Sequence, residues 1–73
     1  MAVRFFFHII GSRSTFTDEE GQNFASVNDA KTYAAVIVSE LGADGGAYNG
    51  FVVSVVDGRG AEVARLPVPC NPG

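Results

Sequence analysis

The first strand-like segment of this chain is apolar at almost every position. Residues 3–10 read Val-Arg-Phe-Phe-Phe-His-Ile-Ile. A strand that covers one layer of core needs an apolar side chain at every second position only, because successive side chains point to opposite faces of the sheet. Residues 51–56, Phe-Val-Val-Ser-Val-Val, share this property. Both segments are therefore predicted to lie in the middle of a sheet that is apolar on its two faces.

The chain is short for a protein with such strands. Its 73 residues leave room for one domain, and a core of this size rarely contributes more than ~3–5 kcal/mol. Small domains gain further stability from disulfides, a structural metal or association with another chain. Cys70 is the only cysteine and His8 the only histidine, so neither an intrachain disulfide nor a metal-ligating cluster is expected. We therefore expect association with another chain and no cofactor.

Residues 26–42 carry the pattern of an amphipathic helix. Ser26 precedes Asp29 by three residues, which is typical of a capped helix start. Gly42 is predicted to end the helix, and Val36 is an apolar exception on its polar side. Apolar residues recur every three or four positions and form one helical face; they are Val27, Ala30, Ala34, Ile37, Val38 and Leu41.

Two further strands are predicted at the edges of the sheet. Residues 15–18 are polar apart from Phe16 and lead into a turn at residues 18–21, where Gly21 suits a positive φ. Residues 61–66 follow an Asp-Gly hairpin turn and end at prolines, which disrupt the middle of a sheet but not its edge.

These elements predict an α+β domain with a four-stranded antiparallel sheet and one helix packed on one face. The strand order is 2-1-3-4 in a ββαββ chain, and the helix forms a right-handed crossover. We expect one domain over residues 1–69 and a flexible tail at residues 70–73. No segment has the ~20 apolar residues of a membrane span or a complete signal-peptide pattern, so a cytoplasmic protein is expected.

One helix covers one face of such a sheet. Apolar side chains from the first three predicted strands are expected to meet it; they are Val3, Phe5, Phe7, Ile9, Phe16, Phe51, Val53 and Val55. The alternate positions point away; they are Arg4, Phe6, His8, Ile10, Val52, Ser54, Val56 and Arg65, with Val63 or a neighbouring residue of the fourth strand beside them. Contiguous exposed apolar patches usually mark interfaces. The second face is therefore predicted to bind another copy in a two-fold homodimer.

The sequence is also compatible with other functions. An aromatic ring on an open sheet beside Arg4 and Arg65 suits stacking with single-stranded bases or a small ligand, although the net charge of −3 disfavours nucleic acid. His8 is the residue type best suited to proton transfer near neutral pH, but no motif places a partner beside it. The acidic residues 18–20 are interpreted as a solvated turn, because they lack the spacing of a calcium loop.

An aromatic first strand, an Asp-Glu-Glu-Gly turn, an alanine-rich helix and the hairpin strand Val-x-x-Val-Val-Asp-Gly-x-Gly occur together in this chain. The combination resembles a family of short uncharacterised bacterial proteins, found mainly in alphaproteobacteria. The matching positions are Phe5, Phe6, Asp18, Gly21, Ala30, Ala34, Leu41, Val56, Asp57 and Gly60. The glycine-rich segment before Phe51 and the C-terminal tail depart from the family pattern. The resemblance implies the ββαββ order and no established reaction.

Overall fold

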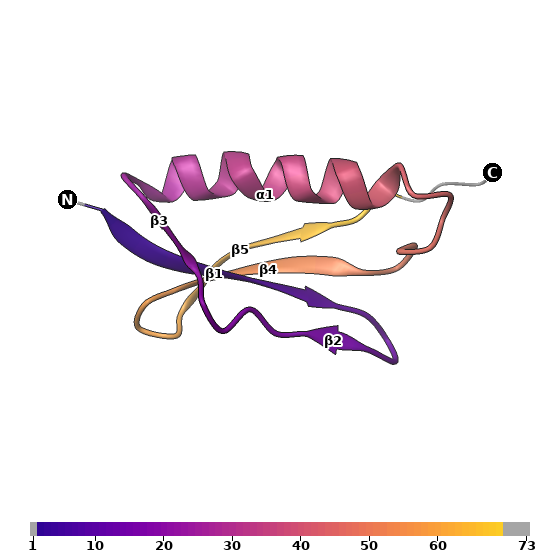
Figure 1. Cartoon of the computed structure of the whole chain (residues 1–73), viewed down its shortest axis with the longest axis horizontal. Coiled ribbons are helices and arrows are strands. Elements are labelled where there is room, and N and C mark those ends of the chain that lie inside the picture. Colours follow the sequence, from indigo (N-terminus) through magenta and orange to yellow (C-terminus); the bar gives the residue numbers. More distant parts are fainter. Residues whose placement is uncertain (1, 70–73) are drawn as a thin grey trace.

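The chain folds into a twisted antiparallel sheet with one helix along one side (Figure 1). The computed structural model describes residues 2–69, so the predicted tail at residues 70–73 lies outside the described residues. The elements are β1 (Val3–Ile10), β2 (Thr15–Phe16), β3 (Gln22–Phe24), α1 (Val27–Gly42), β4 (Val52–Asp57) and β5 (Glu62–Pro67). The predicted α+β class and antiparallel sheet are confirmed.

The strand order is β2-β1-β4-β5, which is the predicted 2-1-3-4 order, with β3 as an additional strand that also pairs with β1. β2 pairs with the end of β1 and β3 with its beginning. Both short strands therefore lie along the same edge of β1, separated by the turn at residues 17–21. The two strands that are apolar on both faces, β1 and β4, occupy the middle as predicted.

The fifth strand, β3, corrects the prediction of four strands. Gln22 and Asn23 are polar, and three residues are too few to show an alternating pattern. The pairing of Phe24 with Val3 explains why a strand forms here despite its polar residues. The ring of Phe24 also packs edge-on against Phe7, at 5.7 Å between centroids, and lies 5.4 Å from the ring of Tyr33. Aromatic packing between distant residues thus holds this segment on the sheet.

The helix begins and ends where the sequence predicts. Ser26 is the N-cap, and its hydroxyl oxygen accepts a hydrogen bond of 3.2 Å from the Asp29 N–H. Gly42 is the last helical residue, but its backbone is not left-handed. A Cβ at Gly42 would lie 3.1 Å from Cδ of Pro69, so a larger residue here would require the C-terminal segment to shift by a few tenths of an ångström. No helix among residues 2–69 is both long and apolar enough to cross a membrane.

The core lies between the helix and one face of the sheet. Phe5 is 1% exposed, and Val53 and Val55 are fully buried, as predicted for this face. Ala30 and Ala34 of the helix are also fully buried above them. These small side chains let α1 approach the sheet closely, so the larger side chains of β1 and β4 fill the space between the two layers.

One predicted position on β2 and one on β5 are wrong. Phe16 was expected in the core but is 54% exposed, because β2 lies at the sheet edge while α1 packs over β3, β4 and β5. Val63, rather than a neighbour, was the first choice for the face away from the helix, but it packs against the core. A register shift between Val55 and Val56 inserts an extra residue in β5, which reverses the direction of the side chains that follow.

Candidate functional site

The face of the sheet away from α1, called the outer face from here on, carries the residues that the sequence singled out. The pairing register and side-chain alternation place all eight there: Arg4, Phe6, His8, Ile10, Val52, Ser54, Val56 and Arg65. Three of the cross-strand pairs between β1 and β4 lie on this face: Phe6 with Val56, His8 with Ser54, and Ile10 with Val52.

The three pairs form bands across the outer face. Two apolar pairs lie on either side of the polar pair of His8 and Ser54. The four apolar side chains are half-buried rather than fully exposed; they are Phe6, Ile10, Val52 and Val56. The predicted contiguous patch is therefore two smaller apolar patches divided by a polar band.

One half of the polar band is a network on β4 and β5. Ser54 is only 3% exposed, and its hydroxyl donates a hydrogen bond of 2.6 Å to Oε2 of Glu62. Arg65 donates to both oxygens of the same carboxylate, at 3.2 Å from Nε and 3.0 Å from Nη2. Hydrogen bonds from Arg65, and then from Ser54, hold the pKa of Glu62 below its ordinary value. The buried hydroxyl and both charges are thereby satisfied.

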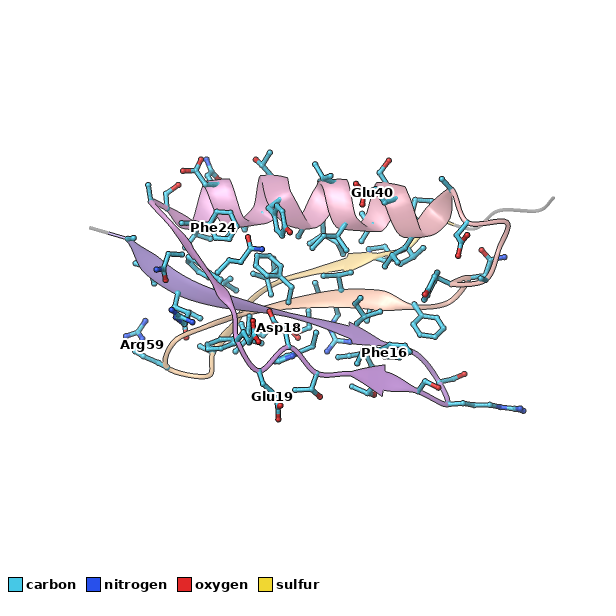
Figure 2. All side chains as sticks on the ribbon, viewed as in Figure 1. Phe16, Asp18, Glu19, Phe24, Glu40 and Arg59 are labelled. Carbon is cyan, nitrogen blue, oxygen red and sulfur yellow. The ribbon has the colours of Figure 1, made fainter. Side chains whose placement is uncertain are left out.

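The other half of the band connects β1 to the turn at residues 17–21. Nδ1 of His8 accepts a hydrogen bond of 3.1 Å from the Asp18 N–H. One carboxylate oxygen of Asp18 accepts from the Phe7 N–H at 3.2 Å, and the other accepts from the N–H groups of Gly21 and Glu20 at 3.0 and 3.2 Å. Asp18 thus takes the place of a strand where the pairing along β1 is interrupted (Figure 2).

These contacts determine the charge of Asp18. Burial raises the pKa of its carboxyl group, but hydrogen bonds from the backbone of Gly21, Phe7 and Glu20, together with the nearby His8, outweigh burial. The pKa of Asp18 is therefore lower than its ordinary value of 3.8. The group is ionised at neutral pH and adds negative charge beside the outer face.

The turn at residues 18–21 also covers part of the outer face. Gly21 has a φ of +72°, as predicted, and a Cβ there would lie 2.9 Å from the ring of Phe6. The guanidinium of Arg4 donates a hydrogen bond to the carbonyl oxygen of Glu20. The turn therefore covers part of Phe6.

Three residue types of a hydrolytic triad meet on this face, but their hydrogen bonds have the wrong sense. In a triad, the aspartate accepts a hydrogen bond from Nδ1 of the histidine, and the serine donates to the histidine. Here Nδ1 of His8 accepts from a backbone N–H, and Ser54 donates to Glu62. The arrangement fastens the turn to the sheet and does not activate a nucleophile.

Sequence reasoning missed the contact between His8 and Asp18. Asp18 and Gly21 are three residues apart, which is typical of a turn in which a carboxylate accepts backbone N–H groups. That signal indicates the turn, but it does not reveal which strand the turn lies against. Among residues 2–69, no group of three or more His, Cys, Asp or Glu side chains could hold a metal ion, and Cys70 lies outside the described residues.

Comparison with known proteins identifies a family but no activity. No curated protein and no solved structure matches the chain. One family model, described as "Domain of unknown function (DUF6894)", matches residues 4–69. The match confirms the resemblance to an uncharacterised family, and the structure has the strand-strand-helix-strand-strand order expected of it. Because the match covers most of the chain, the protein belongs to the DUF6894 family of domains of unknown function.

Proposed function

We propose that this protein is a binding module that forms a homodimer through the outer face of its sheet. The observation that carries the proposal is the pair of apolar bands, Phe6 with Val56 and Ile10 with Val52, on a face that α1 does not cover. Half-buried apolar side chains on neighbouring strands favour contact with a second apolar surface, because association removes them from water.

The edges of the sheet are poorly suited to association, which directs the proposal to its face. On β5, Pro67 lacks a backbone N–H, and Glu62 and Arg65 place charges along the edge. Prolines, charges and bulges are the devices that keep edge strands from pairing with other chains. The opposite edge is interrupted by the turn at residues 17–21, so neither edge offers a long ladder of free backbone groups.

A two-fold axis parallel to the strands, midway between β1 and β4, makes the outer face complementary to itself. The axis brings Phe6 over Val56 of the second copy, Ile10 over Val52, and His8 over Ser54. It also brings the acidic turn at residues 18–21 over β5 of the second copy, near the level of Arg65. Apolar groups thus meet apolar groups, and the acidic turn meets the ion pair of Arg65 with Glu62.

The size of the outer face sets the expected affinity. The strands β1, β2, β3, β4 and β5 have eight, two, three, six and six residues. At a spacing of about 4.8 Å between strands and a rise of about 3.3 Å per residue, they give a face of roughly 400 Å². Two such faces bury about 800 Å², less than the ~1,200 Å² at which stable interfaces begin. We therefore expect a reversible dimer with a Kd in the micromolar range.

Light scattering across micromolar concentrations tests this proposal. The mass is expected to rise from that of one chain towards twice that value, and Phe6→Glu is expected to keep the mass at one chain. Val36→Glu is the matched control, because Val36 is 49% exposed on the helix and away from the outer face. Circular dichroism establishes that each variant is folded. A wild-type mass that stays at one chain, or a folded Phe6→Glu variant that still dimerises, contradicts the proposal.

A further inference from the structure

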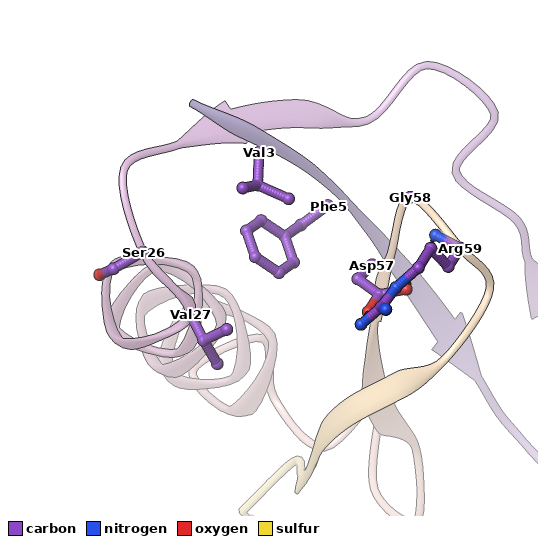
Figure 3. A pocket seen from close by; sticks show the side chains of 7 residues that line it. All are labelled: Val3, Phe5, Ser26, Val27, Asp57, Gly58 and Arg59. Atoms are coloured by element: carbon purple, nitrogen blue, oxygen red, sulfur yellow. Dashed lines mark hydrogen bonds and ion pairs between the residues drawn. The ribbon is translucent and has the colours of Figure 1, made fainter. Parts of the chain in front are cut away.

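An open pocket of about 540 Å³ lies on the helix side of the sheet, at the end where α1 begins (Figure 3). It is bounded by the start of β1, the start of α1 and the turn between β4 and β5. The pocket is separate from the outer face, so its occupant and a second copy of the chain could bind at the same time.

The wall of the pocket is apolar. Val3 is 45% exposed and Val27 is 40% exposed, and both line the pocket. The ring of Phe5, which is 1% exposed, lies between them and the hairpin turn (Figure 3). Val27 was predicted to belong to the buried face of the helix, but at the first helical position it is exposed and lines the pocket. An apolar group bound here would cover both valines.

Asp57 places a carboxylate with spare acceptor capacity beside this wall. The residue is 8% exposed, and Oδ1 accepts hydrogen bonds from the N–H groups of Arg59 and Ala61 at 2.9 and 3.0 Å. Bonds from the backbone of Ala61 and of Arg59 hold the pKa of Asp57 below its ordinary value, so the group is charged at neutral pH. Within residues 2–69, Oδ2 has only the guanidinium of Arg59 nearby, at 3.6 Å, which is longer than a hydrogen bond.

Arg59 supplies the opposite charge at the same site. Its side chain is 90% exposed, and its ion pair with Asp57 is its only charged contact among the described residues. The guanidinium therefore has free donors that could bind a carboxylate in a bidentate way. One buried anion and one exposed cation thus lie side by side at the mouth of an apolar pocket.

We propose that this pocket binds a small zwitterion that carries an ammonium group, a carboxylate and an apolar chain, as an apolar α-amino acid does. The ammonium donates to Oδ2 of Asp57, the carboxylate accepts from Arg59, and the apolar chain covers Val3 and Val27. A lone cation would compete with Arg59 for Asp57, and a lone anion would meet the negative charge of Asp57. A ligand with both charges leaves every charge paired.

An NMR titration of the ¹⁵N-labelled full chain with L-norleucine tests the proposal. We expect saturable shifts of the amide signals of Val3, Val27, Gly58 and Arg59, with a Kd in the millimolar range. Pentylamine, which lacks the carboxylate, and hexanoate, which lacks the ammonium, are expected to bind about tenfold more weakly, the ratio that corresponds to 1.4 kcal/mol. Equal binding of either analogue would overturn the assignment of a zwitterion.

Two variants and one control complete the test. Arg59→Gln removes the cation at a position that is 90% exposed, and Asp57→Asn removes the negative charge while keeping an oxygen for the turn. Each is expected to weaken norleucine binding about tenfold, a loss of one charged contact. Arg13→Gln, an exposed arginine in the turn after β1, is expected to bind as the wild type does. The proposal fails if no pocket amide signal shifts at about 50 mM norleucine, a concentration well above the expected millimolar Kd. It also fails if Arg59→Gln leaves the affinity for norleucine unchanged.

Discussion

The two faces of the sheet are built from the same strands, yet they differ in what covers them. On the helix side, Phe5, Val53 and Val55 are almost fully buried under small helix residues. On the outer face, Phe6 and Val56 are half-buried, and a polar pair interrupts the apolar surface. Both faces of the sheet therefore carry apolar side chains that could form a core, but the single helix covers only one face.

The polar band distinguishes the outer face from the helix-side face, whose centre is apolar throughout. Ser54 and Glu62 satisfy each other across β4 and β5, so the band has no unpaired buried hydroxyl. Polar groups between apolar patches restrict how a partner can sit, because a shifted partner would place apolar side chains against polar ones. In the proposed dimer, the polar band would thus favour one register of contact over non-specific association.

The largest expected effect comes from shortening a side chain on the helix-side face. Phe5→Ala should cost about 3–5 kcal/mol, because it empties the space of a fully buried ring. A loss of this size is comparable with the whole core stability of a small domain. Circular dichroism should show that the variant is largely unfolded, and urea denaturation followed by the same signal measures the loss of stability. Phe6→Ala on the outer face is the matched comparison and should cost clearly less; equal losses would remove the distinction between the faces.

A smaller effect is expected where the turn is fastened to the outer face. Asp18→Ala removes a carboxylate that accepts three backbone N–H groups, and the free energy of unfolding should fall by about 2 kcal/mol. Chemical denaturation measures the change. Glu19→Ala, at an exposed neighbouring position, should have little effect. An Asp18→Ala variant as stable as Glu19→Ala would show that the hydrogen bonds of Asp18 do not hold the turn.

The smallest expected effect is a dependence of stability on pH. The pKa of Asp18 is lower in the folded chain than its ordinary value of 3.8, so the folded state favours the ionised carboxylate. Its contribution is therefore complete above the unfolded pKa and is lost as the pH falls through the lower folded pKa. Denaturation at a series of pH values should show the wild type approaching Asp18→Ala in stability below pH 3.8. A constant difference at all pH values would contradict this.

Local patterns of the sequence predict much of this fold. The cap formed by Ser26 and Asp29, the helical period and the hairpin turn at residues 57–60 depend on neighbours within a few positions. Strands that are apolar on both faces also predict the middle positions of β1 and β4. These signals succeed because each one specifies a backbone conformation or a burial requirement without knowledge of distant residues.

The missed features all depend on contacts between segments far apart in the chain. β3 is held by pairing with β1 and by the ring of Tyr33, and Val63 turns towards the core because of a bulge. The same is true of the candidate site, where eight outer-face residues follow from alternation but the contact of Asp18 with His8 does not. A single sequence shows alternation directly, whereas register shifts and edge pairing appear only in three dimensions.

Methyl NMR during dilution compares the two faces within one sample and tests the central claim most directly. If the outer face binds a second copy, the methyl signals of Ile10, Val52 and Val56 should shift between micromolar and millimolar concentrations. Those of the buried Val53 and Val55 should stay constant, because the helix covers them in both states. Outer-face signals that do not change with concentration, or that change no more than those of the buried valines, would contradict the account.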